Sequence, residues 1–84
     1  MNGRQRKILA AIFAEPVSAS IEWCAVEALF VAVGCEVIEG SGSRVRFNFK
    51  GTIASFHRPH PNKEAKRYQI VEAREFLKQI GVTP

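Results

Sequence analysis

The residues best suited to chemistry in this sequence are two histidines inside a basic segment. His57 and His60 are the only histidines, and from Ser43 to Arg67 seven lysines and arginines stand against a single glutamate, Glu64. An imidazole titrates near neutral pH, so it can accept a proton from a ribose 2′-hydroxyl or donate one to a leaving 5′-oxygen. Neighbouring cations would stabilise the charge that develops on the phosphate. The segment is therefore compatible with metal-independent cleavage of RNA.

Other kinds of phosphate chemistry lack the residues that they need. The chain has no aspartate, and five of its eight glutamates lie between residues 15 and 39, before the basic segment. Two-metal hydrolysis usually relies on clustered carboxylates, so a metal site is not expected. There is no Walker loop and no GxGxxG motif, and Cys24 and Cys35 form no CxxC pair. We predict no metal and no cofactor, and interpret both cysteines as small apolar core residues.

A β-hairpin is predicted to carry the first histidine. In the segment RVRFNF, residues 44–49, apolar and polar side chains alternate, which is typical of a strand with one buried and one exposed face. Lys50 and Gly51 suit a two-residue loop, with the glycine at a positive φ. The next strand would then run over Thr52–His57.

The register of this hairpin decides which side chains meet on its polar face. A two-residue loop at positions 50 and 51 places Arg44 opposite His57 and Arg46 opposite Ser55, with β-carbons about 4.5 to 5.5 Å apart. A slip of one residue would move every side chain to the other face. The predicted polar face therefore brings a histidine beside two arginines.

The second histidine is interpreted differently. His60 stands between Pro59 and Pro61, which prevent the strand from continuing. We expect a loop residue whose ring caps the last helix or packs against the sheet. Tyr68, near the start of that helix, is predicted to be a packing residue with a solvated hydroxyl.

Helices flank the predicted strands on both sides. Apolar residues recur at three- and four-residue spacing over about residues 3–14, 22–33 and 70–80. Ser20 or Glu22 could cap the second helix, and Gly34 and Gly81 are expected to end the second and third.

The order of elements predicts an α+β fold. A short strand at Cys35–Glu39 and the flexible EGSGS turn complete a three-stranded antiparallel sheet, with helices on one face and the other face open. At 84 residues we expect one domain over 1–84, with an N-terminal helix and linker at 1–20 and the core at 22–82. No segment approaches the length of a membrane helix, and a cytoplasmic location is expected.

Three segments together resemble a known family. ALFVAVGCEVIEGSGSRVRFNFKG, HRPHPNKEAK and EAREFLKQIG look like the HicA toxins of bacterial and archaeal toxin–antitoxin modules, over about Glu22 to Val82. The resemblance implies a fold related to the double-stranded-RNA-binding domain (dsRBD), with two helices packed on a three-stranded sheet. It also implies a ribonuclease that cleaves mRNA without the ribosome and is held inactive by a HicB antitoxin.

The sequence departs from this family at one position. HicA proteins normally place their catalytic histidine just after the Gly-Ser turn, and here that position is Ser43 or Arg44. Because the register places His57 opposite Arg44, we predict that His57 serves as the general acid and base. The predicted RNA-binding residues are Arg44, Arg46, Lys50, Arg58 and Lys63.

Two other functions remain open. One is a non-catalytic RNA-binding module of the same fold. The other is an antitoxin or protein-interaction module that has lost nuclease activity and uses its basic surface to bind an acidic partner. The N-terminal helix lies outside the resemblance. It could extend the core through Ile8, Leu9, Ile12 and Phe13, or provide a dimer or antitoxin contact.

Overall fold

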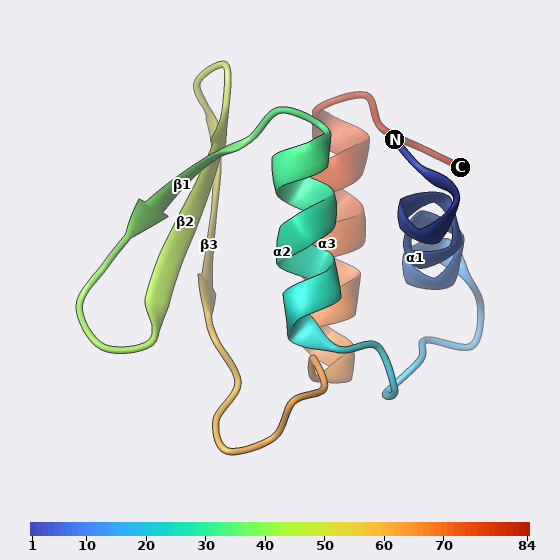
Figure 1. The fold of residues 1–84 in the computed structure, drawn as a ribbon, viewed down its shortest axis with the longest axis horizontal. Coiled ribbons are helices and arrows are strands. Elements are labelled where there is room, and N and C mark those ends of the chain that lie inside the picture. The colour runs from blue at the N-terminus through green and yellow to red at the C-terminus, as the bar shows by residue number, and fades with distance from the viewer.

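The computed structural model describes all residues from Met1 to Pro84 and has the expected α+β fold (Figure 1). The elements follow in the order α1 (Gly3–Phe13), α2 (Trp23–Ala32), β1 (Glu36–Glu39), β2 (Arg44–Phe49), β3 (Thr52–His57) and α3 (Arg67–Gln79). The strands form one antiparallel sheet in the order β1-β2-β3. In Figure 1, α2 and α3 lie against one face of the sheet, and α1 lies on the far side of this helix pair. The other face of the sheet carries no helix.

The hairpin of β2 and β3 has the predicted register. Arg44 pairs with His57 at the open end, and Lys50 and Gly51 form the loop. The sequence predicts a positive φ at the glycine alone, but both loop residues have one, 49° at Lys50 and 95° at Gly51. Two positive φ values are typical of a type I′ turn, whose twist matches that of the strands. The Asn48 side-chain oxygen supports the loop by accepting the Gly51 N–H at 2.8 Å.

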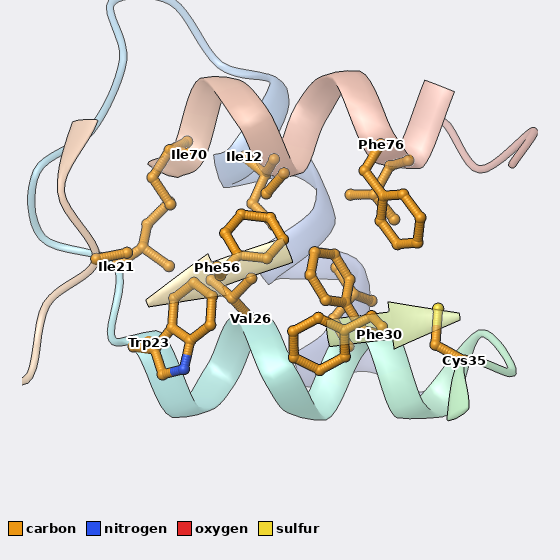
Figure 2. Close-up of a cluster of buried hydrophobic side chains, with 14 of the residues drawn as sticks. Ile12, Ile21, Trp23, Val26, Phe30, Cys35, Phe56, Ile70 and Phe76 are labelled. Atoms are coloured by element: carbon orange, nitrogen blue, oxygen red, sulfur yellow. The ribbon is translucent and has the colours of Figure 1, made fainter. Parts of the chain in front are cut away.

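An aromatic core fills the space between the sheet and the pair α2 and α3 (Figure 2). Val45, Phe47 and Phe56 point inward from β2 and β3, and each is at most 5% exposed. The ring of Phe30 on α2 lies 4.8 Å from that of Phe47 and 5.3 Å from that of Phe76 on α3, both in edge-on contact. Burying a side chain of this size stabilises the fold by about 1.5 to 3 kcal/mol. Burial of these residues therefore fixes which face of the hairpin turns toward the helices.

The N-terminal helix α1 extends this core. Leu9 and Ile12 are 4% and 0% exposed. Arg74 of α3 holds the end of α1, because its guanidinium donates to the backbone oxygens of Ile12 and Ala14 at 3.0 and 3.1 Å and pairs with Glu15 at 2.6 Å. Of the two roles open for this helix, extension of the core describes the structure.

The predicted glycines follow the helices that they were expected to end. Gly34 and Gly81 have φ values of 111° and 81°, just after α2 and α3. Glu22 occupies the N-cap position of α2, but its side chain makes no capping hydrogen bond. The loop after β3 packs there, since the Trp23 N–H donates to the Lys63 backbone oxygen at 2.9 Å.

The two cysteines differ in environment. Cys35 is buried as predicted, and burial raises the pKa of its thiol. The prediction is wrong for Cys24, which lies on an exposed face of α2 because its neighbours Trp23 and Val26 take the buried positions. No three His, Cys, Asp or Glu side chains lie close enough together to hold a metal ion. None of the helices is long and apolar enough to cross a membrane.

Candidate nucleic-acid interface

The open face of the sheet gathers the polar half of the hairpin. Arg44 and Arg46 on β2 and Ser55 and His57 on β3 are exposed, and the register pairs them as Arg44 with His57 and Arg46 with Ser55. A depression of about 570 Å³ covers this region. Its polar lining consists of Gly40, Ser41, Arg44, Arg46, Ser55 and His57. The structure thus brings His57 together with two of the five predicted cations.

A tight turn between β1 and β2 holds Arg44 beside the depression. The Gly40 N–H donates to the Arg44 backbone oxygen at 3.0 Å, and the Arg44 N–H donates to the Ser41 backbone oxygen at 3.2 Å. A β-carbon at Gly40 would lie only 2.9 Å from that of Arg44, so glycine is required for this approach. The turn also contacts the end of β3, because the Arg58 N–H donates to the Ser43 oxygen at 2.8 Å.

Arg58 follows His57 in the chain but turns toward the helices. Its guanidinium donates to Glu27 of α2 at 2.7 and 3.2 Å and to Glu39 of β1 at 2.6 and 2.9 Å. The Glu27 carboxylate also accepts the indole N–H of Trp23. Hydrogen bonds to Glu39 and Glu27 raise the pKa of Arg58, and the hydrogen bond from Arg58 lowers the pKa of Glu39. We refer to Arg58, Glu27 and Glu39 as the Arg58 cluster.

The distribution of ion pairs leaves the arginines of the open face without partners. The acidic segment at residues 15–39 supplies glutamates to Arg58 and Arg74, whereas Arg44 and Arg46 make no salt bridge with any residue. An arginine without an internal partner keeps all five of its N–H donors for a ligand. The open face is therefore positive around His57, although the whole chain has a net charge of only +4.

The two remaining predicted RNA-binding cations lie apart from His57 and the arginines beside it. Lys50 occupies the loop at the opposite end of the hairpin from Arg44, a separation of roughly 20 Å at about 3.3 Å per residue (Figure 1). Lys63 is exposed in the loop that leaves the sheet at the His57 end. Only Arg44 and Arg46 lie beside His57 on the sheet.

Two aromatic rings near the start of α3 are more exposed than the sequence predicts. His60 is exposed and makes no hydrogen bond, and Lys66 takes the N-cap position of α3. The prediction that His60 caps this helix or packs against the sheet is therefore wrong. The loop packs through Ala65, which is 1% exposed, and Tyr68 is 57% exposed.

One polar residue that reaches the site carried no sequence signal. Gln69 is 2% exposed and is the only buried polar side chain. Its Nε2 donates to the backbone oxygen of His57 at 2.7 Å, and its Oε1 accepts the Lys66 N–H at 3.0 Å. The second bond is half of a capping box, but a lysine side chain has no acceptor for the other half. The usual sequence pattern of a capping box is therefore missing.

Comparison with known proteins identifies the family to which this fold belongs. The family model described as the HicA toxin of bacterial toxin–antitoxin matches residues 23–82. The match covers α2, the whole sheet and α3, and α1 precedes it. No curated protein and no solved structure matches the chain. Because the match spans well over half of the sequence and includes every residue around the depression, the chain belongs to the HicA toxin family of bacterial toxin–antitoxin systems.

Proposed function

We propose that this toxin is a metal-independent endoribonuclease acting on mRNA, with His57 as the general acid and base. The observation that carries the proposal is the exposed pair of His57 and Arg44 across the hairpin, next to Arg46, with neither arginine bound to a protein carboxylate. A titratable ring beside unpaired cations provides proton transfer and charge stabilisation at one place.

The proposed reaction is an internal transesterification of RNA. The His57 imidazole takes the proton of a ribose 2′-hydroxyl, and the 2′-oxygen attacks the adjacent phosphorus. The bond from phosphorus to the 5′-oxygen breaks, and the imidazolium returns the proton to that oxygen. The products are a 2′,3′-cyclic phosphate and a 5′-hydroxyl. Arg44, directly opposite His57, would bind the non-bridging oxygens through its planar donors, with Arg46 on the neighbouring phosphate.

The other predicted RNA-binding residues take lesser parts in this proposal. Lys63 lies where RNA leaving the depression at the His57 end would pass. Lys50 would be reached only by RNA that follows the hairpin along its length. Arg58 does not belong to the proposed RNA-binding surface, because its guanidinium is already bound to the carboxylates of Glu27 and Glu39.

The two histidines provide the test and its matched control. His57→Ala is expected to lower the rate of RNA cleavage in EDTA by on the order of 10² to 10⁴, the usual contribution of an acid–base group. It should also relieve growth arrest on expression. His60→Ala, an exposed change three residues later, should leave both unchanged. Substrate with 2′-O-methyl ribose should bind and remain intact. Wild-type cleavage by the His57 variant would contradict the proposal.

A non-catalytic RNA-binding role is the second candidate, and one observation favours it. The position after the Gly-Ser turn, where HicA relatives are expected to carry their histidine, is Ser43 or Arg44 here. In this case the wild-type chain would shift RNA in a salt-dependent way without cutting it. A protein-interaction module that has lost nuclease activity would do neither.

We further propose that a HicB-like antitoxin covers the open face of the sheet, in the cytoplasm. Charge complementarity requires an acidic partner surface at Arg44 and Arg46. Arg44→Glu combined with Arg46→Glu should abolish copurification with the antitoxin, whereas Arg4→Glu on α1 should not.

A further inference from the structure

The backbone at His57 is held from two sides. On the sheet side, the N–H of the next residue, Arg58, donates to the Ser43 oxygen at 2.8 Å. On the other side, the His57 carbonyl accepts the Nε2 of Gln69 at 2.7 Å. The second contact comes from α3 and crosses from a helix to the edge of the sheet. It is the only side-chain hydrogen bond that any residue makes to His57.

The amide of Gln69 makes two bonds with different consequences. Its oxygen accepts the Lys66 N–H at 3.0 Å, which stabilises the start of α3. Its nitrogen binds the last residue of β3, an edge strand whose outer carbonyl has no neighbouring strand to pair with. A glutamate at this position could supply the oxygen but, when ionised, not the donor. Capping of the helix therefore accounts for only one of the two hydrogen bonds that the Gln69 side chain makes.

Because Gln69 is buried, the hydrogen bond from its Nε2 to the His57 carbonyl is costly to lose. Gln69 is 2% exposed, so water cannot readily replace it at the His57 carbonyl. A buried polar group left without a partner costs about 1 to 3 kcal/mol. Without this bond, the end of β3 would shift or fray, and the position of the exposed ring of His57 depends on the backbone that carries it.

We propose that Gln69 is a positioning residue, which holds the His57 peptide so that the imidazole faces the phosphate bound by Arg44. This inference rests on the proposed function of His57. Gln69 itself touches no substrate. Small displacements of a reacting group lower the turnover number while leaving substrate binding intact, by factors of up to about a hundredfold for a shift of 1 Å.

Three variants separate positioning from helix capping. Gln69→Leu removes both hydrogen bonds, and Gln69→Glu keeps the acceptor for Lys66 but removes the donor to His57 once the introduced carboxyl ionises. Lys66→Pro removes only the cap, since proline lacks the N–H and the φ of −71° at this position suits its ring. Each variant is compared with the wild-type chain for kcat, KM and thermal stability.

Positioning predicts a split between these measurements. Gln69→Leu should lower kcat by about tenfold or more with KM within about twofold, measured well below its melting temperature. Gln69→Glu should approach wild-type kcat at acidic pH, where its protonated carboxyl can donate to the His57 carbonyl, and fall relative to wild type as pH rises. Lys66→Pro should lose thermal stability and retain kcat. A purely structural role of Gln69 would not produce this contrast in kcat between Lys66→Pro and Gln69→Leu.

Proton NMR of the imidazole rings provides a second readout. The chain has only two histidines, so His60→Ala assigns both ring signals. Gln69→Leu should shift or broaden the His57 signal and leave that of His60 in place. If Gln69→Leu keeps wild-type kcat and an unchanged His57 signal while His57→Ala is inactive, positioning is overturned and the proposed function stands. If His57→Ala itself cleaves normally, the proposed site fails, and the positioning role of Gln69 fails with it.

Discussion

The two faces of the β2–β3 hairpin are built from alternate residues of the same strands, and they differ in almost every physical property. On the helix side, Phe47 and Phe56 are at most 5% exposed, and Arg58 is bound to two glutamates. On the open side, Arg46 and His57 are exposed, and neither takes part in a salt bridge. Adjacent positions along the strand therefore alternate between side chains that stabilise the fold and side chains that are exposed and make no ion pair.

This difference indicates how charge is divided in a small basic domain. Three of the five glutamates between residues 15 and 39 neutralise arginines that connect elements of the fold: Glu27 and Glu39 pair with Arg58, and Glu15 pairs with Arg74. Cations that remain unpaired on the sheet add no stability through ion pairs and repel one another weakly in water. Their placement around one depression is consistent with a ligand that supplies the missing negative charge.

The helix-side face should show the largest effect on stability. Phe47→Ala is expected to lower the free energy of unfolding by about 3 to 5 kcal/mol, because Phe47 is fully buried against Phe30 and Trp23. This is a large part of the total for a domain of this size. Urea unfolding followed by far-UV circular dichroism measures it.

Ile53→Ala is the matched control on the open face. Ile53 is 50% exposed and one strand position from Ala54, which is partly buried and packs against the core. Its loss should change the free energy of unfolding by less than about 1 kcal/mol. If Ile53→Ala and Phe47→Ala lose equal free energy of unfolding, the Ile53 side chain is buried in solution, and the open face is not free.

The Arg58 cluster should show a smaller effect that depends on pH. Arg58→Met leaves Glu27 half-buried without its cation, so the melting temperature at pH 7 should fall, though by less than for Phe47→Ala. The hydrogen bond from Arg58 lowers the pKa of Glu39 in the folded state. A carboxyl of this kind stabilises the fold above its ordinary pKa of about 4.3, and the contribution is lost as the pH falls through the lowered folded value.

The expected signature is therefore a gap in melting temperature that closes in acid. Melting temperatures of wild type and Arg58→Met are compared between pH 7 and pH 3 at fixed ionic strength. The gap should persist down to about pH 4.3 and shrink below it. Arg46 lies on the open face, so the melting temperature of Arg46→Met should differ little from that of wild type at any pH. A constant gap for Arg58→Met down to pH 3 would argue that packing of its side chain, not its charge, stabilises the fold.

Local information was enough to predict the hairpin but not the partners of its last residues. The alternation of RVRFNF and a loop of two residues determine the register, so the pairing of His57 with Arg44 could be predicted from the sequence. Arg58 lies next to His57, yet its partners are 31 and 19 residues away in the chain. No local pattern indicates such distant contacts, and Arg58 therefore looked like any other cation of the basic segment.

The same reason explains the other differences. The bond from Gln69 to the His57 carbonyl spans 12 residues and two element types, and it depends on how α3 docks against the edge of β3. The sequence predicts that the ring of His60 caps the last helix or packs against the sheet, but Lys66 takes the N-cap position and His60 is exposed. Periodicity located the helices and strands, whereas contacts between them needed the packed structure.

The smallest effect on stability is expected for the arginines of the open face, and it is the sharpest test of the comparison. Arg44→Ala and Arg46→Ala should each change the free energy of unfolding by no more than about 0.5 kcal/mol, since neither side chain has a partner in the protein to lose. Binding of a single-stranded RNA, measured in a His57→Ala background to prevent cleavage, should nevertheless weaken. The slope of log K against log salt concentration should decrease by about 0.7 for each phosphate contact removed. Arg58→Met should leave that slope unchanged, because its charge is already balanced by Glu27 and Glu39. If the slope falls for Arg58→Met and not for Arg44→Ala or Arg46→Ala, RNA binds on the helix side of β3, and the two faces have the opposite roles from those inferred here.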